Sequence, residues 1–307
     1  MNEKIIHTTD YKNHFWNALR GREHSTAVFG EGQDIQTGGY VLPAGSEDGY
    51  DRAIRKESLF RNIATVVRAY GGSERIFAKD CEDLAAWVPE GEAIPLANGT
   101  EDFTTHAVDS HKLATFVKLD NDFIRDAAFD FEGYLTGRMA KCFARAEDSS
   151  FLTGNGIDQP AGLLHPEKGA ETGVTTSALT YDDVVKLYFS VKPEYHRNGV
   201  WLMNDETALT LRTVKDENGN YLWNHSDDTI LGKPVEICEY MPNTENGKTP
   251  VLFGDFRYYW IVLRSPVTVK RITELYVRYD QTGYLAIEFL DGKLIRREAV
   301  KALRITA

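Results

Sequence analysis

The stretch FEGYLTGRMAKCFARAEDSSFLTGNG, residues 131–156, contains the strongest helical signal in the sequence. Apolar side chains recur in it at steps of three and four residues, as Phe131, Leu135 and Met139 illustrate, and charged residues fill other positions. This spacing predicts one long helix over 131–152, which would span roughly 30 Å and form the spine of a domain. The Gly-Asn-Gly sequence behind it is typical of a helix end.

The sequence before this helix predicts a short helix, an arm and a second helix. Residues 8–20 combine a Thr or Asp cap with an apolar side at helical spacing. Residues 21–38 are rich in glycine and polar residues and contain few large apolar side chains, so we expect an extended arm. Ser46 is expected to cap the next helix, and TVVRAY at 65–70 predicts a strand.

Between residues 71 and 116 the pattern changes to isolated or alternating apolar residues separated by turn sequences such as GGS, PEGEAIP and NGTED. This pattern predicts a long hairpin excursion. A two-stranded excursion has too few neighbours to be stable alone, and its edges need a partner. We expect that partner to be another subunit; the alternative is a hairpin that folds back on its own domain.

The sequence after the spine helix predicts mixed α and β structure. Thr180 is expected to cap one helix, and Asp205 is expected to begin another after a buried strand at 199–204. Further strands are predicted at PVEIC (234–238), VLFGDF (251–256), YYWIVL (258–263), LAIEF (285–289) and VKALRI (300–305). The fold class expected from this succession is α+β.

Charge and composition restrict the classes of function. The formal net charge is −11, which argues against binding of nucleic acid by a broad basic surface but is compatible with a container that encloses it. No apolar run approaches the roughly 20 residues of a membrane helix, and the N-terminus does not resemble a signal peptide, so a cytoplasmic product without a membrane partner is expected.

No motif for catalysis, cofactor binding or metal binding is present in the sequence. The cysteines Cys81, Cys142 and Cys238 are far apart and are expected to be buried free thiols. The turn at 154–156 follows a helix and lacks the spacing of a phosphate-binding loop, and Asp255 has no paired base or nucleophile, so turn roles are expected for both. We therefore expect no enzyme activity, no cofactor and no metal.

Six segments, in this order, resemble the major capsid proteins of tailed bacteriophages and prophages, which share the fold first seen in the Hong Kong ninety-seven phage. They are GGYVLP (38–43); AAWVPEGEAIP (85–95); AEDSSFLTGNGIDQPAGLL (146–164); WLMNDETALTLRTVKDENGNYLW (201–223) with LGKPVEICEYMP (231–242); VLFGDFRYYWIVLR (251–264); and FLDGKLIRREAVKAL (289–303). They extend over most of the chain from residue 38 onward.

The resemblance implies a phage major capsid fold with four parts. These are an N-terminal arm with short helices at 1–56; a peripheral domain, with the spine helix on a long sheet, at 57–68, 117–163 and 262–296; an extended hairpin called the E-loop at 69–116; and an axial domain, a mixed sheet with helices, at 164–261 and 297–307. In this arrangement the E-loop and the arm reach over neighbouring subunits.

The resemblance also implies contacts and partners. The expected inter-subunit contacts at the E-loop tip are Trp87, Val88, Glu92 and Ile94, and the expected arm residues are Tyr11, Phe15, Trp16 and Tyr40. Identical subunits would form pentamers and hexamers that close into an icosahedral virion shell, assembled in the bacterial host cytoplasm. The shell would enclose double-stranded DNA without sequence-specific binding, with a separate scaffolding protein, a portal and a maturation protease as further partners.

Some family members join subunits through an E-loop lysine and an asparagine of the peripheral domain. Here PEGEAIP offers Glu92 and no lysine, and the partner region near Gln281 and Thr282 offers no asparagine, so we expect no self-crosslinking. Others carry a scaffolding segment before the arm; only about 37 residues precede GGYVLP, so we expect scaffolding to be a separate protein or the helix at 8–20 to contribute to it.

Two other functions remain open at this stage. An encapsulin-like nanocompartment would use the same fold to enclose cargo enzymes, and copurified protein cargo would distinguish it. A hydrolase or transferase of mixed α/β fold would need an active site that the sequence does not contain.

Overall fold

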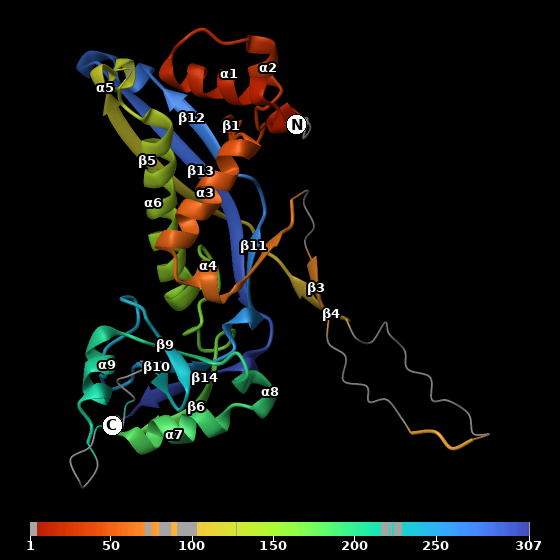
Figure 1. Cartoon of the computed structure of the whole chain (residues 1–307), viewed down its shortest axis with the longest axis vertical. Helices are drawn as coiled ribbons and strands as arrows, with labels where there is room; N and C mark the ends of the chain where they lie inside the picture. The colour runs from red at the N-terminus through yellow and green to blue at the C-terminus, as the bar shows by residue number, and fades with distance from the viewer. Residues whose placement is uncertain are drawn as a thin grey trace.

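The predicted spine helix is present as α6 (Phe131–Thr153), and it ends immediately before Gly154 as the sequence predicts. Asp130 caps it by accepting a hydrogen bond at Oδ1 from the Gly133 N–H at 3.0 Å. The computed structural model describes residues 5–70, 75–79, 87–90, 103–126, 128–215, 221, 223 and 229–306. Figure 1 shows two bodies stacked along the long axis, with a hairpin that projects sideways.

The upper body in Figure 1 is built on a six-stranded sheet with one long central strand, β13. Along one edge of β13 lies β5, and along the other lie β12, next to its first half, and β11, next to its second half. The strands are β1 (Tyr40–Val41), β2 (Thr65–Arg68), β5 (His111–Asp120), β11 (Tyr259–Leu263), β12 (Thr268–Ile272) and β13 (Gln281–Leu294). Ten of the fourteen residues of β13 are buried and the other four are half-buried, as expected for a central strand.

Helices from the first half of the chain cover this sheet. They are η1 (Ile5–His7), α1 (Thr9–Arg20), α2 (Thr26–Gly30), α3 (Ala44–Glu57), α4 (Phe60–Ile63) and α5 (Asn121–Arg125). As predicted, Thr8 caps α1, and its Oγ1 accepts the Tyr11 N–H at 3.1 Å. Apolar side chains of α1, α3 and α6 form one buried cluster against β12 and β13, so these helices belong to the body of the subunit.

The lower body contains a second six-stranded sheet in the order β6-β14-β10-β7-β9-β8. Its strands are β6 (Glu171–Thr176), β7 (Val200–Met203), β8 (Thr229–Ile230), β9 (Lys233–Ile237), β10 (Val251–Gly254) and β14 (Val300–Ile305), and its helices are α7 (Tyr181–Ser190), α8 (Pro193–His196) and α9 (Asp205–Arg212). Thr180 closes a capping box with Asp183 at the start of α7, as predicted. The 3-10 helices η2 (Phe256–Tyr258) and η4 (Arg297–Ala299) lie where the chain passes between the two sheets.

A continuous apolar cluster joins the two bodies. The end of α6 contributes Phe151 and Leu152, the first sheet contributes Tyr259 and Ile261, and the second sheet contributes residues that include Leu202. Phe151 and Tyr259 are fully buried, with ring centroids 5.5 Å apart. The bodies are therefore held by a shared core in addition to the chain connections between them.

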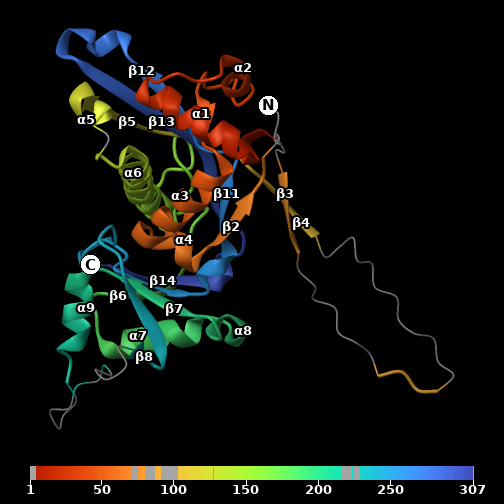
Figure 2. The same cartoon turned by 45° about the horizontal axis from the view of Figure 1, so that its top comes forward.

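The projecting hairpin consists of β3 (Arg75–Lys79) and β4 (Phe103–Ala107), paired antiparallel. The two viewing directions of Figures 1 and 2 agree that it points away from both bodies. The coloured segment of residues 87–90 lies far from the rest of the subunit in both views. The described part of the hairpin thus does not fold back on its own domain.

Three expectations about element boundaries are wrong. Ser46 does not cap a helix: α3 begins after Pro43, and Ser46 lies buried inside it. The strand predicted at 285–289 extends over 281–294, because pairing on both edges lengthens it beyond what its apolar run indicates. Residues 111–116, expected in the E-loop, belong to β5 and pair with β13.

The expectation of an extended arm at 21–38 is also wrong. Ser25 caps the short helix α2, and Phe29 in it is buried and stacked on Tyr40 with ring centroids 3.6 Å apart. Gln33 forms an isolated bridge with Tyr40. The buried ring of Phe29 and the partly buried Val28 pack this polar stretch against the body.

Candidate assembly surface

The root of the hairpin is fixed to the first sheet by a buried carboxylate. Asp291 on β13 is 1% exposed, and its Oδ2 accepts the backbone N–H of Asp109 at 2.9 Å. His111 Nε2 lies 3.6 Å from Asp291 Oδ1, and Lys293 Nζ lies 3.7 Å from Oδ2 and donates to the carbonyl of Ala107. One side chain of the sheet therefore orients the backbone where the hairpin leaves it.

Apolar packing supports the same root. Ile76 of β3 and Val108 are buried together with Val262 of β11, and Trp260 and Ile295 pack around them half-buried. Only one face of the two-stranded ladder is covered in this way, since β3 alternates between exposed and buried residues. The hairpin is thus anchored at one end and leaves one face and its far part exposed.

The uncovered face of the hairpin carries aromatic side chains. Phe77 is 62% exposed and Phe103 is 50% exposed, and the register places them as diagonal neighbours on one face. Sequence reasoning missed both; strict alternation in RIFAK, with Ile76 and Ala78 inward, would have placed Phe77 on the outer face. Exposed aromatics on a projecting ladder are typical of a surface that packs against another molecule.

The expected tip residues are placed only in part. Trp87 is fully exposed and Val88 is half-buried, whereas Glu92 and Ile94 lie outside the described residues. A fully exposed tryptophan has a large apolar area in water, which is unfavourable unless a partner covers it. Trp87 is therefore the largest uncovered apolar side chain in the described part of the hairpin.

The expected arm residues lie within their own subunit. Tyr11 and Phe15 are fully buried, Trp16 is almost so, and Tyr40 is half-buried. Tyr11 Oη donates to the Val41 carbonyl at 2.8 Å, and burial, with Tyr40 nearby, raises the pKa of Tyr11 well above its usual value. Trp16 Nε1 donates to Ser46 Oγ at 3.1 Å. Tyr11, Phe15 and Trp16 therefore attach the N-terminal segment to its own body, whereas Tyr40 keeps part of its side chain exposed. Contact of these residues with a neighbouring subunit stays a prediction.

A buried ionic cluster joins the N-terminal helices to the spine helix and the central strand. Arg61 of α4 binds Glu147 of α6 with two hydrogen bonds of 2.7 and 2.8 Å and reaches Glu288 of β13 at 3.2 Å. Tyr50 of α3 donates to the other oxygen of Glu288 at 3.0 Å. Burial raises the pKa of Glu288 to about 7, and Arg61 opposes this while Glu147 adds to it.

Asp148 completes the attachment of α4. Its Oδ1 accepts the Ser58 hydroxyl at 2.7 Å, and its two oxygens accept the backbone N–H groups of Leu59 and Phe60 at 2.8 and 3.2 Å. Burial raises the pKa of Asp148, and these hydrogen bonds lower it in part. Glu147 and Asp148 of the spine helix therefore hold four groups of the preceding segment: two side chains and two backbone N–H groups.

The end of the upper body opposite the lower body carries a second apolar surface. The 3-10 helix η3 (Glu274–Tyr279) has no buried residue, and its Leu275, Val277 and Tyr279 are each about 70% exposed. Phe123 of α5 is also exposed at this end. Sequence reasoning gave no prediction for this segment, because ELYVRY has no clear period of either kind.

The two motifs considered for chemistry are structural turns. Asn155 Oδ1 accepts the backbone N–H groups of Ile157, Asp158 and Gln159 at 3.0 to 3.3 Å, which closes the loop on itself. Asp255 is buried, accepts the Arg257 N–H at 3.1 Å and forms an ion pair with the Arg257 guanidinium. The expectation of turn roles for both is confirmed.

The described residues contain no group of three or more His, Cys, Asp or Glu side chains placed to hold a metal ion. Within those residues, no helix is long and apolar enough to cross a membrane. Cys238 is buried, and burial raises the pKa of its thiol to about 11. Cys142 is only half-buried, which corrects the expectation for it, and Cys81 lies outside the described residues.

Comparison with known proteins gives consistent matches. The family model described as "Phage capsid family" matches residues 38–305. The "Probable major capsid protein gp17" of Mycobacterium phage D29 is 25% identical over 241 residues, which cover 73% of this chain and 74% of that protein.

Solved structures match the fold. A chain from "Capsid of empty GTA particle computed with C5 symmetry" has a TM-score of 0.69 and 28% identity, covering 82% of this chain and 90% of that chain. A chain of Gordonia phage Cozz has a TM-score of 0.56 at 13% identity, covering 82% and 87%, and shows the likeness of fold alone. The expected α+β capsid fold is confirmed by these likenesses.

Proposed function

This chain belongs to the phage capsid family, and from that premise we propose that its copies form pentamers and hexamers and close into an icosahedral shell around the double-stranded DNA of a tailed phage or prophage. The observation that carries the proposal is the family match over residues 38–305, together with a likeness of fold to a capsid chain over 82% of this chain. The family match extends over both six-stranded sheets and the β3–β4 hairpin.

The proposal assigns the parts of the subunit as follows. The body on β13 corresponds to the peripheral domain, the body on β10 to the axial domain, and the β3–β4 hairpin to the E-loop. The hairpin supports an assembly role because it leaves its own subunit and exposes Phe77, Phe103 and Trp87. In the shell a neighbouring copy would cover these side chains, with Val88, Glu92 and Ile94 as further contacts at the tip.

The charge of the chain supports enclosure of DNA without sequence-specific binding. At a formal net charge of −11, the subunit as a whole repels a polyanion, so packaged DNA would stay mobile inside the shell. A separate scaffolding protein, a portal and a maturation protease are the further partners that this proposal includes. Assembly would take place in the host cytoplasm, and the product would be the virion capsid.

Negative-stain electron microscopy and size-exclusion chromatography of the purified protein at high concentration test the proposal. We expect closed shells, rings or capsomers of five or six subunits. A protein that remains monomeric under all conditions, including coexpression with neighbouring phage genes, would contradict it. Shells that copurify with protein cargo instead of DNA would contradict the DNA-enclosing part and indicate a nanocompartment.

The absence of covalent crosslinking is a separate expectation. The expectation that the partner region near Thr282 has no asparagine is wrong, because Asn121 of α5 lies against it and its Oδ1 accepts the Thr282 hydroxyl at 2.7 Å. The sequence between 80 and 102 nevertheless contains no lysine that could react with such an asparagine. We expect denaturing gels of assembled shells to show only monomer, and a ladder of multimers would contradict this.

A further inference from the structure

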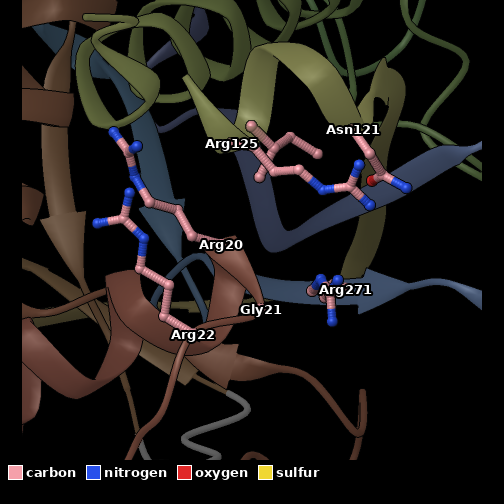
Figure 3. A pocket seen from close by; sticks show the side chains of 7 residues that line it. Arg20, Gly21, Arg22, Asn121, Arg125 and Arg271 are labelled. Atoms are coloured by element: carbon pink, nitrogen blue, oxygen red, sulfur yellow. The ribbon is translucent and has the colours of Figure 1, made fainter. Parts of the chain in front are cut away.

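A pocket at the upper end of the first body is lined by arginines from three elements. Arg20 and Arg22 come from the end of α1, Arg125 comes from α5, and Arg271 comes from β12. Asn121 lies on the same wall as Arg125 (Figure 3). No carboxylate is among the residues that line the pocket, although the chain as a whole is acidic.

Local backbone geometry creates this arrangement. The α1 helix ends at Gly21 with φ +73°, and the N–H groups of Gly21 and Arg22 bond to the Ala18 and Asn17 carbonyls at 3.0 and 2.8 Å. This is a Schellman end, which turns the chain and places Arg22 beyond the helix. A Cβ at Gly21 would lie 2.8 Å from a terminal nitrogen of Arg271, so glycine also leaves room for that guanidinium.

The charges in the pocket are only partly compensated within the subunit. Arg20 donates to the Phe129 carbonyl at 3.1 Å, and its guanidinium lies 5.3 Å from the centre of the Phe131 ring. Arg125 lies 3.6 Å from a carboxylate oxygen of Asp280, but both side chains are largely exposed.

The two other arginines lack acidic partners. Across the described ranges, neither Arg22 nor Arg271 forms an ion pair. The Nε of Arg271 is buried and has no hydrogen-bond partner. Burial raises the pKa of Tyr284 to about 12, and Arg271, through its charge and a hydrogen bond, and Arg20, through its charge, lower this pKa in part.

We propose that this pocket binds a phosphate oxyanion, either free phosphate or a phosphate of the DNA backbone. Guanidinium groups present planar pairs of N–H donors that match phosphate oxygens. A compact anion also reduces the mutual repulsion of neighbouring arginines, and free phosphate does so more than the singly charged phosphodiester of DNA. Since Arg20 and Arg22 belong to the N-terminal segment and Arg271 belongs to the sheet, the bound anion also holds that segment on the sheet. The site does not depend on the proposed function; only the DNA source does.

Titration with inorganic phosphate at constant ionic strength, followed by calorimetry and by hydrogen exchange of the α1 amides, tests the proposal. We expect saturable binding and slower exchange in α1. Arg22→Gln, at an exposed position, and Arg271→Gln are each expected to weaken binding about tenfold, as loss of one charge-assisted hydrogen bond predicts. Arg52→Gln, which makes the same change of charge on α3 outside the pocket, is expected to leave the affinity unchanged.

Competition with a short DNA duplex distinguishes the two sources of phosphate. A duplex that displaces phosphate from the wild type, but binds Arg22→Gln more weakly, identifies the DNA backbone as the ligand; a duplex that does not compete identifies free phosphate. The proposal is wrong if chloride at equal ionic strength slows exchange as much as phosphate does, or if Arg22→Gln binds like Arg52→Gln. The proposal is also wrong if phosphate binds neither the wild type nor Arg22→Gln while Arg22→Gln alters shell assembly. The arginines of the pocket would then bind carboxylates of another copy of the chain.

Discussion

The N-terminal segment and the β3–β4 hairpin both carry several aromatic side chains, but these side chains lie in opposite environments. Tyr11 and Phe15 are completely buried against the sheet, whereas Phe77 and Trp87 are largely or fully exposed. The first set therefore stabilises the free subunit, and the second contributes only when another molecule covers it. Under the proposed function, the stability of the subunit and the assembly of the shell therefore depend on different aromatic residues.

The strongest test of this division is Phe15→Ala. Phe15 is fully buried and packs edge-on against Trp16 with ring centroids 5.1 Å apart. The change should lower the free energy of unfolding of the free subunit by about 3–5 kcal/mol, since it removes a buried ring and leaves a cavity. Denaturant unfolding measures it. A loss below about 1 kcal/mol, the size typical of an average substitution, would mean that the segment is not anchored as described.

The second test concerns the attachment of α3 through Tyr50 and Glu288. Burial raises the pKa of Glu288 from its ordinary 4.5 to about 7, so the folded state holds a proton that the unfolded state releases. The contribution of Glu288 to the free energy of unfolding is therefore complete below pH 4.5 and declines as the pH rises to about 7. Above pH 7 this contribution no longer changes with pH. The slope is at most about 1.4 kcal/mol per pH unit.

Glu288→Gln should remove this part of the pH dependence, because an amide does not titrate in this pH range. Its one oxygen replaces only one of the two carboxylate oxygens, which accept separately from Tyr50 and Arg61, so the variant is also expected to be less stable at every pH. The free energy of unfolding, measured between pH 4.5 and 7.5, should fall less steeply in the variant than in the wild type. Glu57→Gln, at an exposed position of α3, serves as the control and should leave the profile unchanged. Parallel profiles for wild type and Glu288→Gln would contradict the assignment.

The third test moves to the hairpin with Trp87→Ala. Stability of the free subunit should change by less than about 0.5 kcal/mol, as for other exposed positions. The concentration needed for assembly should rise about tenfold or more, because a tryptophan covered at an interface commonly contributes about 2 kcal/mol. Light scattering measures assembly, and Trp87→Phe should retain most of it. Unchanged assembly in Trp87→Ala would remove this residue from the contact surface.

Much of the fold follows from local sequence signals. The α6 helix, its end before Gly154, and the caps at Thr8 and Thr180 depend on residues a few positions apart, and the sequence predicts each of them. The attachment of the N-terminal segment does not follow in this way. Arg61 binds partners 86 and 227 positions away, and no local pattern indicates such a cluster.

The candidate surface was predicted less completely for a similar reason. Trp87 stands out in the sequence as a large apolar residue among turn residues. The exposed side chains of η3 and the pocket around Arg271 both depend on which elements meet at one end of the sheet. A single sequence does not show which elements meet, so neither feature could be predicted. In the same way, Phe29 makes α2 part of the body although the stretch from residue 21 to 38 is mostly polar.

The smallest effect is expected at the hairpin root with Asp291→Asn. The carboxylate accepts the Asp109 N–H and lies near Lys293, and the amide keeps one accepting oxygen but loses the charge. The free energy of local opening at the Asp109 amide should fall by about 1–2 kcal/mol, while the α1 amides are unaffected. Hydrogen exchange measures both in one experiment. Asp109→Asn, whose side chain is largely exposed and 3.5 Å from Lys293, should change the root by less than about 0.5 kcal/mol. If α1 and the root lost protection together in Asp291→Asn, the two regions would open as one unit, and the division between them would not hold.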